Sequence, residues 1–413
     1  MTAHEKTESN LKLSGGVVIT PTPLKNARRI ERNNNMEKVL TDSIDEITLI
    51  LLPTKESNSQ EWDKNRKDMI LAFLYRSKLE MVYGTTAQAD KSKQAGYTDS
   101  LIFPDKPLLS ISWHKIFDNM GVCVHFSALA WTMYQTNYSK TYHECINVAD
   151  FLRIVQSDGY VTRLSRIDFV ADYKNFPSSV SPDAIYREII EKKLIVRNCE
   201  NRKVVLRKEA LNKEGYYRTV YLGSRKSNTR CFCRIYDKKE EQLQTMGHYY
   251  QEAMNCDSWV RHEVVFRNTY AQQITEELLN NVHTDDELQS FIAQKITEKY
   301  QFYEADASEP TDYTKALLEV VGNHKFPLLR NPSPRDNNLN ASIRYLRTGS
   351  GLYSVLYKVS CIWGNDAEKK LLELFYSEYK EKYKKDVLKN KDIFLWLKKH
   401  QDNLKNDNLN DYF

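Results

Sequence analysis

The sequence lacks the motifs of several large enzyme classes. It contains no GxxxxGK[ST] segment for a phosphate-binding loop and no GxGxxG at the start of a helix. It also lacks GxSxG, HExxH and any paired-cysteine pattern with zinc spacing. An ATP-driven motor and hydrolysis by a serine triad are therefore unsupported.

Cysteine is sparse and long apolar runs are missing. The seven cysteines are scattered over 413 residues without a CxxC pair, which is typical of a protein of the reducing cytosol. The first residues, MTAHEKTESNLKLSGG, contain no apolar segment of a signal peptide. No stretch approaches the roughly 20 apolar residues of a membrane span. These absences predict a cytoplasmic protein with no membrane partner.

The chain also lacks a large excess of either basic or acidic residues. The chain has 60 Lys and Arg against 55 Asp and Glu, a formal net charge of +5, which excludes a uniformly basic coating. Any nucleic-acid surface must therefore come from local clustering. Residues 224–239 do cluster, with six Lys or Arg opposed only by Asp237.

The order of the segments predicts an α+β protein in which a domain with antiparallel strands precedes a helical domain. Expected strands cover 44–52, 108–113 and 122–131, and expected helices cover 61–82 and 143–155. The predicted domains are a flexible arm at 1–40, the α+β domain at 41–268, a helical domain at 269–405 and a frayed tail at 406–413. Expected C-terminal helices cover 285–304, 366–385 and 391–404, with Leu371, Leu372, Phe375 and Tyr379 facing inward.

One stretch, 216–241, is predicted to be two strands joined by a basic turn. Alternation in the second strand sets Phe232, Arg234, Tyr236 and Lys238 on one face. A tyrosine between two cations suits phosphate chemistry, because the cations stabilise the phenolate and the charge on phosphorus. An exposed sheet face with ordinary solvated charges is the alternative interpretation.

Two further strands carry carboxylates. In 161–173, alternation places Asp168 and Asp172 on the same face, and in 259–267 it places Glu263 between arginines. Carboxylates on an otherwise apolar strand are costly to bury, so they need a cation or a metal ion. Salt bridges to Arg163 or Arg166 would serve equally well for the first pair.

A candidate tyrosine, carboxylates on strands and clustered cations together are typical of a metal-assisted DNA-nicking site. A divalent cation, Mg²⁺ or Mn²⁺, would polarise the scissile phosphate while the tyrosine attacks. The HxH metal pair of many nickases is missing, and His125 stands alone in VCVHFS. A lone strand histidine is more often a packed or surface residue than a ligand.

Three segments, in this order, resemble the replication initiation factor family: SRIDFVADY (165–173), YLGSRKSNTRCFCRIYDKKEE (221–241) and WVRHEVVFR (259–267). The family contains the Rep proteins of rolling-circle plasmids, related phage initiators and nicking relaxases. The resemblance covers about 44–270. It implies a sequence-specific nickase with a single tyrosine, whose fold resembles a degenerate HUH endonuclease without the histidine pair.

The resemblance assigns roles to individual residues. The tyrosine of the family's R-I-Y-[DN]-K-K motif falls on Tyr236, and His125 stands where many members carry a glutamate. The predicted catalytic residues are Tyr236, Arg234 and Lys238. The predicted metal ligands are Asp168, Asp172, Glu263 and His125. The predicted DNA-binding residues are Arg225, Lys226, Arg230 and Arg261.

The implied function is initiation of rolling-circle replication. The protein would bind double-stranded origin DNA, where an inverted repeat extrudes a hairpin, and nick one strand to leave a 5′-phosphotyrosyl bond and a 3′-hydroxyl primer. A host polymerase would extend the primer, and a host helicase would unwind the duplex because the chain has no motor motif. Many such initiators are homodimers, although no segment here identifies an interface. A relaxase of a conjugative or integrative element and a non-catalytic origin-binding regulator are the alternatives.

Overall fold

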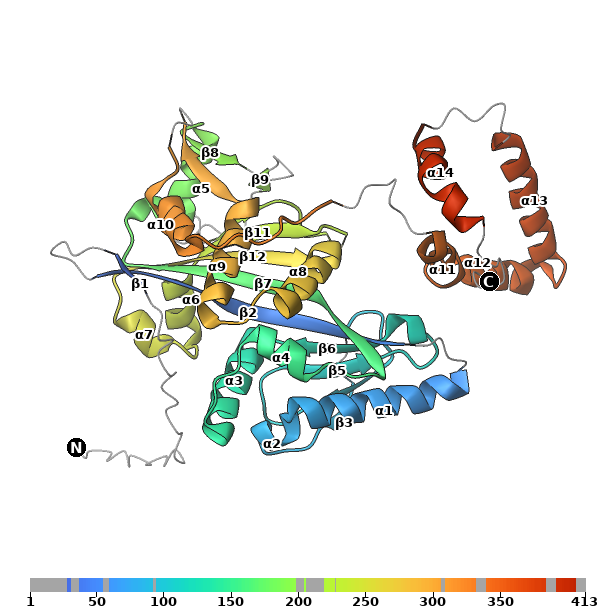
Figure 1. Ribbon diagram of the computed structural model, residues 1–413, viewed down its shortest axis with the longest axis horizontal. Helices are drawn as coiled ribbons and strands as arrows, with labels where there is room; N and C mark the ends of the chain where they lie inside the picture. Colours follow the sequence, from blue (N-terminus) through green and yellow to red (C-terminus); the bar gives the residue numbers. More distant parts are fainter. Residues whose placement is uncertain are drawn as a thin grey trace, which may run out of the picture.

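The computed structural model describes most of the chain (Figure 1). The described residues are 28–30, 37–54, 59–91, 94–197, 204–205, 219–226, 228–305, 309–331, 339–383 and 391–405. The predicted frayed tail at 406–413 lies outside them. So does the predicted flexible arm at 1–40, except for 28–30, which form a strand, and 37–40, where a long strand begins at Lys38.

Most of the described strands build one large antiparallel sheet, as the sequence predicted. The order across the sheet is β3 (Gln88–Asp90), β4 (Asp99–Ile102), β5 (Leu109–Trp113), β6 (Val122–Phe126), β2 (Lys38–Pro53), β7 (Tyr160–Lys174), β12 (Trp259–Arg267), β11 (Cys231–Asp237), β10 (Thr219–Leu222) and β9 (Val204–Val205). β1 (Arg28–Ile30) pairs with β2, and β8 (Leu194–Arg197) pairs with β13 (Gln301–Glu304) in a separate small sheet. The long strands β2 and β7 form the centre.

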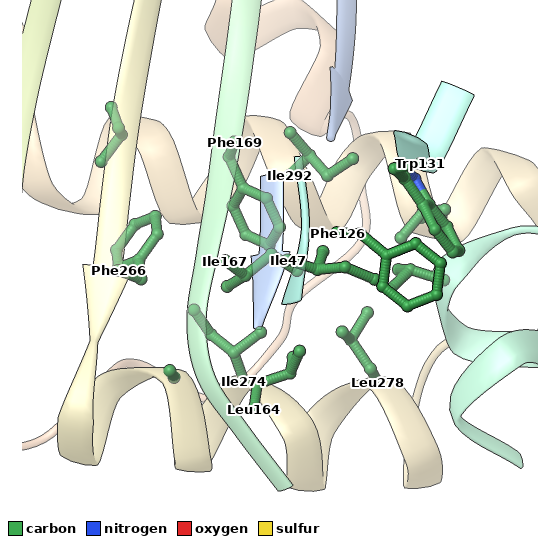
Figure 2. Packing of buried hydrophobic residues seen from close by; sticks show 14 of the residues in the cluster. Ile47, Phe126, Trp131, Leu164, Ile167, Phe169, Phe266, Ile274, Leu278 and Ile292 are labelled. Carbon is green, nitrogen blue, oxygen red and sulfur yellow. The ribbon is translucent and has the colours of Figure 1, made fainter. Parts of the chain in front are cut away.

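Most helices of this part pack on one face of this sheet and bury its apolar side chains, whereas the two short helices between β11 and β12 pack around Trp259 on the other face. The helices of this part are α1 (Ser59–Ser77), α2 (Leu79–Tyr83), α3 (Ala128–Tyr142), α4 (Val148–Ile154), α5 (Pro182–Ile190), α6 (Lys238–Thr245), α7 (Tyr250–Met254), α8 (Asn268–Asn280), α9 (Asp285–Lys299) and α10 (Asp312–Val321). Figure 2 shows Phe169 and Phe266 on the sheet above Ile274 of α8. The two phenylalanine ring centroids are 5.4 Å apart, and both side chains are fully buried. Each such side chain contributes about 1.5–3 kcal/mol of burial free energy.

A β-bulge interrupts β2 where it crosses the middle of β7. Ile44 and Ile47 both keep their places on the core face, although three positions separate them. Asp45 and Glu46 lie between them, opposite the single residue Asp168 of β7. The extra residue of a bulge breaks the period of two. Two consecutive acidic side chains therefore reach arginines on the face away from the core.

Four elements differ from the sequence prediction. The strand expected over 122–131 ends at Phe126, because the Ser127 side chain accepts a hydrogen bond from the Ala130 amide and begins α3. The helix expected over 143–155 begins only at Val148, after Asn147 caps α4 in the same way.

The helix expected over 285–304 ends at Lys299, and β13 follows it. Helix 61–82 is divided into α1 and α2 at Lys78, whose φ of 56° is left-handed.

The C-terminal part is helical, as predicted, with α11 (Leu339–Thr348), α12 (Leu352–Trp363), α13 (Ala367–Lys382) and α14 (Lys391–Leu404). The prediction of an inward face on α13 is wrong. Leu372, Phe375 and Tyr379 are 43%, 44% and 57% exposed, and Leu371 is half-buried. No other element covers that face in the described part of the chain, since α12 and α13 contain no buried side chain. None of the described helices has the length and apolar character needed to cross a membrane.

Candidate active site

The face of the sheet opposite the core carries the charged residues that the sequence singled out. In the β11–β12 register, Tyr236 lies opposite Arg261, and Arg234 lies opposite Glu263. In the β12–β7 register, Arg261 lies opposite Asp172. Directly opposed residues share a face. The alternation predicted from sequence therefore places these side chains together across three adjacent strands.

Tyr236 lies within this polar face and is only 9% exposed. Its hydroxyl donates to the Oε2 of Glu263 over 3.5 Å. The guanidinium of Arg234 lies 4.8 Å from the ring centroid, and Nζ of Lys238 lies 5.7 Å from it. Burial raises the pKa of Tyr236 far above its usual value, although Arg261 opposes the shift. The resting phenol is therefore protonated, and Glu263 is the carboxylate within reach of its proton.

Lys238 reaches Tyr236 from a helix, which differs from the strand position expected for it. β11 ends at Asp237, whose side chain accepts a hydrogen bond from the amide of Glu240 and caps α6. Lys238 is the first residue of α6 and forms an ion pair with Glu241 at 2.7 Å. Lys238 therefore lies beside Tyr236 as expected, but it extends from helix α6 and not from strand β11.

The carboxylates beside Tyr236 are paired with arginines. Glu263 is 2% exposed and accepts a hydrogen bond from Arg234. Asp168 is 1% exposed and accepts a hydrogen bond of 2.9 Å from Nε of Arg166. Burial raises the pKa of Asp168 well above its usual value, Arg166 opposes this shift, and the nearby charge of Glu263 adds to it. The two buried acids are thus close enough for the charge of one to affect the other.

Glu46, at the bulge, is a site residue that the sequence reasoning missed. It accepts a hydrogen bond from Arg166 and lies 3.7 Å from Nδ1 of His125. Burial raises its pKa, and Arg166 opposes that shift. The sequence feature that could have revealed Glu46 is the segment Ile44-Asp45-Glu46-Ile47. In it, two core isoleucines are three positions apart instead of two, which indicates a bulge.

His125 lies at the edge of the same polar face. Its Nδ1 is 3.2 Å from Oγ1 of Thr48, its directly opposed residue on β2. Burial lowers the pKa of His125 to about 4, and Arg166 adds to this effect. The imidazole is therefore neutral at neutral pH, and its Nδ1 is engaged by Thr48.

A second cluster surrounds Arg261. Its Nε and Nη2 bind both oxygens of Asp172 at 2.7 and 2.8 Å, and its Nη1 binds Asp45 at 2.6 Å. Although burial opposes ionisation of Asp172, Arg261 holds the pKa of that carboxyl below its usual value. Arg261 is 4% exposed and pairs with two carboxylates. Its guanidinium is therefore not on an open surface that could face DNA.

The four predicted metal ligands do not form one ion site as the side chains stand. Asp172 belongs to the cluster of Arg261, whereas Asp168 and Glu263 are engaged by Arg166 and Arg234. In the part of the chain that the structure describes, no group of three or more His, Cys, Asp or Glu side chains is arranged to hold an ion. The residues therefore do not fit a preformed divalent-cation site.

The other predicted DNA-binding residues lie at one end of β10 and β11. Arg225 and Lys226 are exposed in the segment that follows β10. Arg230, just before β11, binds the side chain of Asn331 and lies 5.8 Å from the ring centroid of Tyr270. Of these residues, Arg225 extends the polar face with positive charge, because it lies over the ring of Tyr221, which is opposite Arg234.

The segments that build this site match a known family. The replication initiation factor family model matches residues 162–371, about half of the chain, which includes β7, β11 and β12. The chain belongs to the replication initiation factor family. The resemblance drawn from the three strand segments is thereby confirmed.

A structure described as the rolling circle replication initiator protein from Geobacillus stearothermophilus aligns with a TM-score of 0.47 and 16% sequence identity. The alignment covers 70% of this chain and 100% of that one. No curated protein matches the sequence.

Proposed function

We propose that this member of the replication initiation factor family starts rolling-circle replication by nicking one strand of double-stranded origin DNA. The hydroxyl oxygen of Tyr236 attacks the scissile phosphorus, and the bond from phosphorus to the 3′-oxygen breaks. The products are a 5′-phosphotyrosyl bond and a 3′-hydroxyl primer. The observation that carries the proposal is the contact of Tyr236 with buried Glu263, beside Arg234 and Lys238.

Each neighbour of Tyr236 has a distinct part in this reaction. Glu263 accepts the phenolic proton as the oxygen attacks, since its Oε2 already lies 3.5 Å from that oxygen, and returns it to the departing 3′-oxygen to give the 3′-hydroxyl. Arg234 and Lys238 balance the charge that develops on the phosphate oxygens. Arg261, held by two carboxylates, stays fixed beside the ring and favours the phenolate.

The proposal extends to DNA and to partner proteins. Arg225, Lys226 and Arg230 bind phosphates next to the nick, so origin binding weakens steeply as salt rises. The strand-rich part, 41–268, acts as the nicking domain with a fold like an HUH endonuclease, and 269–405 supports it. A host helicase and a host polymerase continue replication, and a homodimer acts at a hairpin of the origin. A relaxase of a mobile element would use the same chemistry, and the neighbouring genes distinguish the two.

A non-catalytic origin-binding regulator is the second candidate function, and two observations favour it. The acids around Tyr236 are already engaged by arginines, and the tyrosine itself is 9% exposed. Such a site holds the sheet together without reaching a phosphate. The two candidates differ in chemistry and can be separated by experiment.

The test uses the full chain and a supercoiled plasmid carrying the DNA that adjoins its gene, with Mg²⁺ or Mn²⁺ present. We expect relaxed circles and a covalent protein–DNA adduct with the wild type, and a loss of at least about 100-fold with Tyr236→Phe. Tyr303→Phe on β13 is the matched control, since Tyr303 also lies against an arginine, 3.9 Å from Arg197, but on the small sheet. It should nick like the wild type.

Two results would count against this function. Equal nicking by Tyr236→Phe and the wild type would show that another group is the nucleophile. Origin binding by both proteins without nicking by either would establish the non-catalytic regulator.

A further inference from the structure

The exposed side of α13 carries a row of three tyrosines. Tyr376 and Tyr379 belong to the helix, and Tyr383 is the residue that caps its C-terminal end. Spacings of three and four residues place all three on one side of a helix. Each side chain is more than half exposed. The row is therefore accessible to a binding partner.

The three rings are spaced regularly along the helix. The ring centroids of Tyr376 and Tyr379 are 6.1 Å apart, with 31° between the ring planes. Those of Tyr379 and Tyr383 are also 6.1 Å apart, with 25° between the planes. A base that is stacked on both sides separates its neighbours by about 6.8 Å, twice the 3.4 Å repeat of stacked bases. The spacing of the rings is close to this separation, so a small rotation of the side chains admits a base.

Positive charge accompanies the tyrosines. Nζ of Lys380 lies 4.5 Å from the ring centroid of Tyr376, and in the described part of the chain no carboxylate pairs with it. Residues 339–405 contain 14 Lys and Arg against 8 Asp and Glu, whereas the whole chain contains 60 against 55. The net positive charge of the protein is therefore concentrated in its C-terminal helices, where it favours an anionic partner.

The chemistry of this side of α13 favours single-stranded DNA over a protein. The core of a protein–protein interface is depleted of lysine, yet Lys380 lies directly beside Tyr376. Single-stranded nucleic acid suits both residue types, because its bases stack on aromatic rings and its phosphates bind cations. In a duplex, by contrast, the bases are already stacked on one another and cannot reach the rings.

We propose that α13 binds single-stranded DNA, with bases stacked on Tyr376, Tyr379 and Tyr383 and a phosphate bound by Lys380. The strand it holds is the one displaced from the origin after the nick, so this assignment rests on the proposed function. Stacking does not depend on sequence, because every base has an aromatic face. The displaced strand therefore binds α13 whatever its sequence, and its return to the template is slowed.

The tyrosines are tested by fluorescence anisotropy with a labelled oligothymidine and the full chain. We expect Tyr379→Ala to weaken binding by at least about 5-fold, because one stacked base is lost. Tyr379→Phe keeps the ring and should bind like the wild type. Tyr75→Ala is the matched control, since Tyr75 is also an exposed helical tyrosine but lies on α1. It should leave the affinity unchanged.

Lys380 is tested through the salt dependence of the same binding. Each phosphate contact on a single strand adds about 0.7 to the slope of log affinity against log salt concentration. Lys380→Gln should reduce the slope by about that amount. Lys380→Arg keeps the charge and should keep the slope.

Three results would overturn the proposal. The first is wild-type affinity for oligothymidine in Tyr379→Ala. The second is an equal loss of affinity for duplex and for oligothymidine in that variant, because paired bases do not stack on the rings. The third is a dimer, seen by sedimentation of the wild type, that Tyr379→Ala dissociates, because a second copy would then cover the tyrosines. A wild type that binds oligothymidine through Tyr379 but does not nick the plasmid would overturn the proposed function and leave this binding site in place.

Discussion

Arg261 lies between two carboxylates from different strands, Asp172 on β7 and Asp45 at the bulge of β2. All three hydrogen bonds are 2.6–2.8 Å long, and the guanidinium is buried. A buried charge that loses its partner is strongly destabilising. This residue therefore links the stability of the sheet to the electrostatics of Tyr236.

We expect Asp172→Asn to lower the free energy of unfolding by about 3–5 kcal/mol, because Arg261 then keeps a buried charge without its bidentate partner. Urea denaturation of the full chain measures the change. Lys67→Ala removes an exposed ion pair with Asp63, so it is the control and should leave the urea midpoint unchanged. An unchanged midpoint for Asp172→Asn would show that the buried pair is not formed in solution.

His262 gives the protein a stability that depends on pH. It is fully buried among the rings of Tyr173, Phe302 and Tyr313, and burial lowers its pKa to about 3. The unfolded chain binds a proton near pH 6.5, whereas the folded chain does not. The stabilisation is therefore complete above about pH 6.5 and is lost as the pH falls toward the folded pKa.

We expect His262→Phe to remove up to about 1.4 kcal/mol per pH unit from the pH dependence of unfolding between about pH 4 and pH 6. The slope of unfolding free energy against pH is compared with that of the wild type. His248→Phe, at an exposed position, is the control and should keep the wild-type slope. Identical slopes for all three proteins would contradict a buried neutral His262.

At the scale of elements, sequence alternation placed β7, β11 and β12 correctly, because each has one apolar face to bury. It grouped Tyr236 with Arg234, and Asp168 with Asp172, on shared faces. It missed two local exceptions to the strand period. Asp237 ends β11 with a cap, and the bulge of β2 presents Glu46. Both depend on hydrogen bonds or register between strands, which periodicity within one segment does not contain.

The turn before β6 provides an element-scale prediction. Gly121 has a φ of +67°, and an added Cβ would lie 2.3 Å from the carbonyl oxygen of Leu51 on β2. Gly84, at the end of α2, has a φ of +66° with nothing within 4 Å. We expect Gly84→Ala to cost only the left-handed strain, about 1–2 kcal/mol. Gly121→Ala should cost about 1–3 kcal/mol more, because β2 and β6 must move apart.

Urea midpoints of these two variants measure the difference. Equal midpoints would mean that β6 does not approach β2 as closely as the register requires.

At the scale of the whole molecule, the arginines of the polar face form ion pairs with the carboxylates that the sequence analysis had assigned to a metal ion. Sequence identified the acids and the cations but not which acid pairs with which cation, since pairing is decided by strand order. β12 lies between β7 and β11, so the acids of β7 and β12 come within reach of arginines from three strands.

We therefore expect the melting temperature of the DNA-free protein to be the same in Mg²⁺ and in EDTA. A ligand that binds the folded state raises the melting temperature, and these acids are already engaged. Differential scanning fluorimetry measures this, with Ca²⁺ as a control for non-specific ion effects. A higher melting temperature in Mg²⁺ alone would reveal a preformed ion site.

The bulge of β2 also affects how this protein can change by mutation. Because one surplus residue separates Ile44 from Ile47, loss of a single codon at 45 or 46 would restore the regular strand and leave both isoleucines in the core. Such a deletion would take one carboxylate from the site while the sheet kept its register. Deletions in strands usually turn every later side chain to the wrong face. Here, a one-residue deletion would act like a point substitution. It would change the chemistry of the site and leave the fold intact.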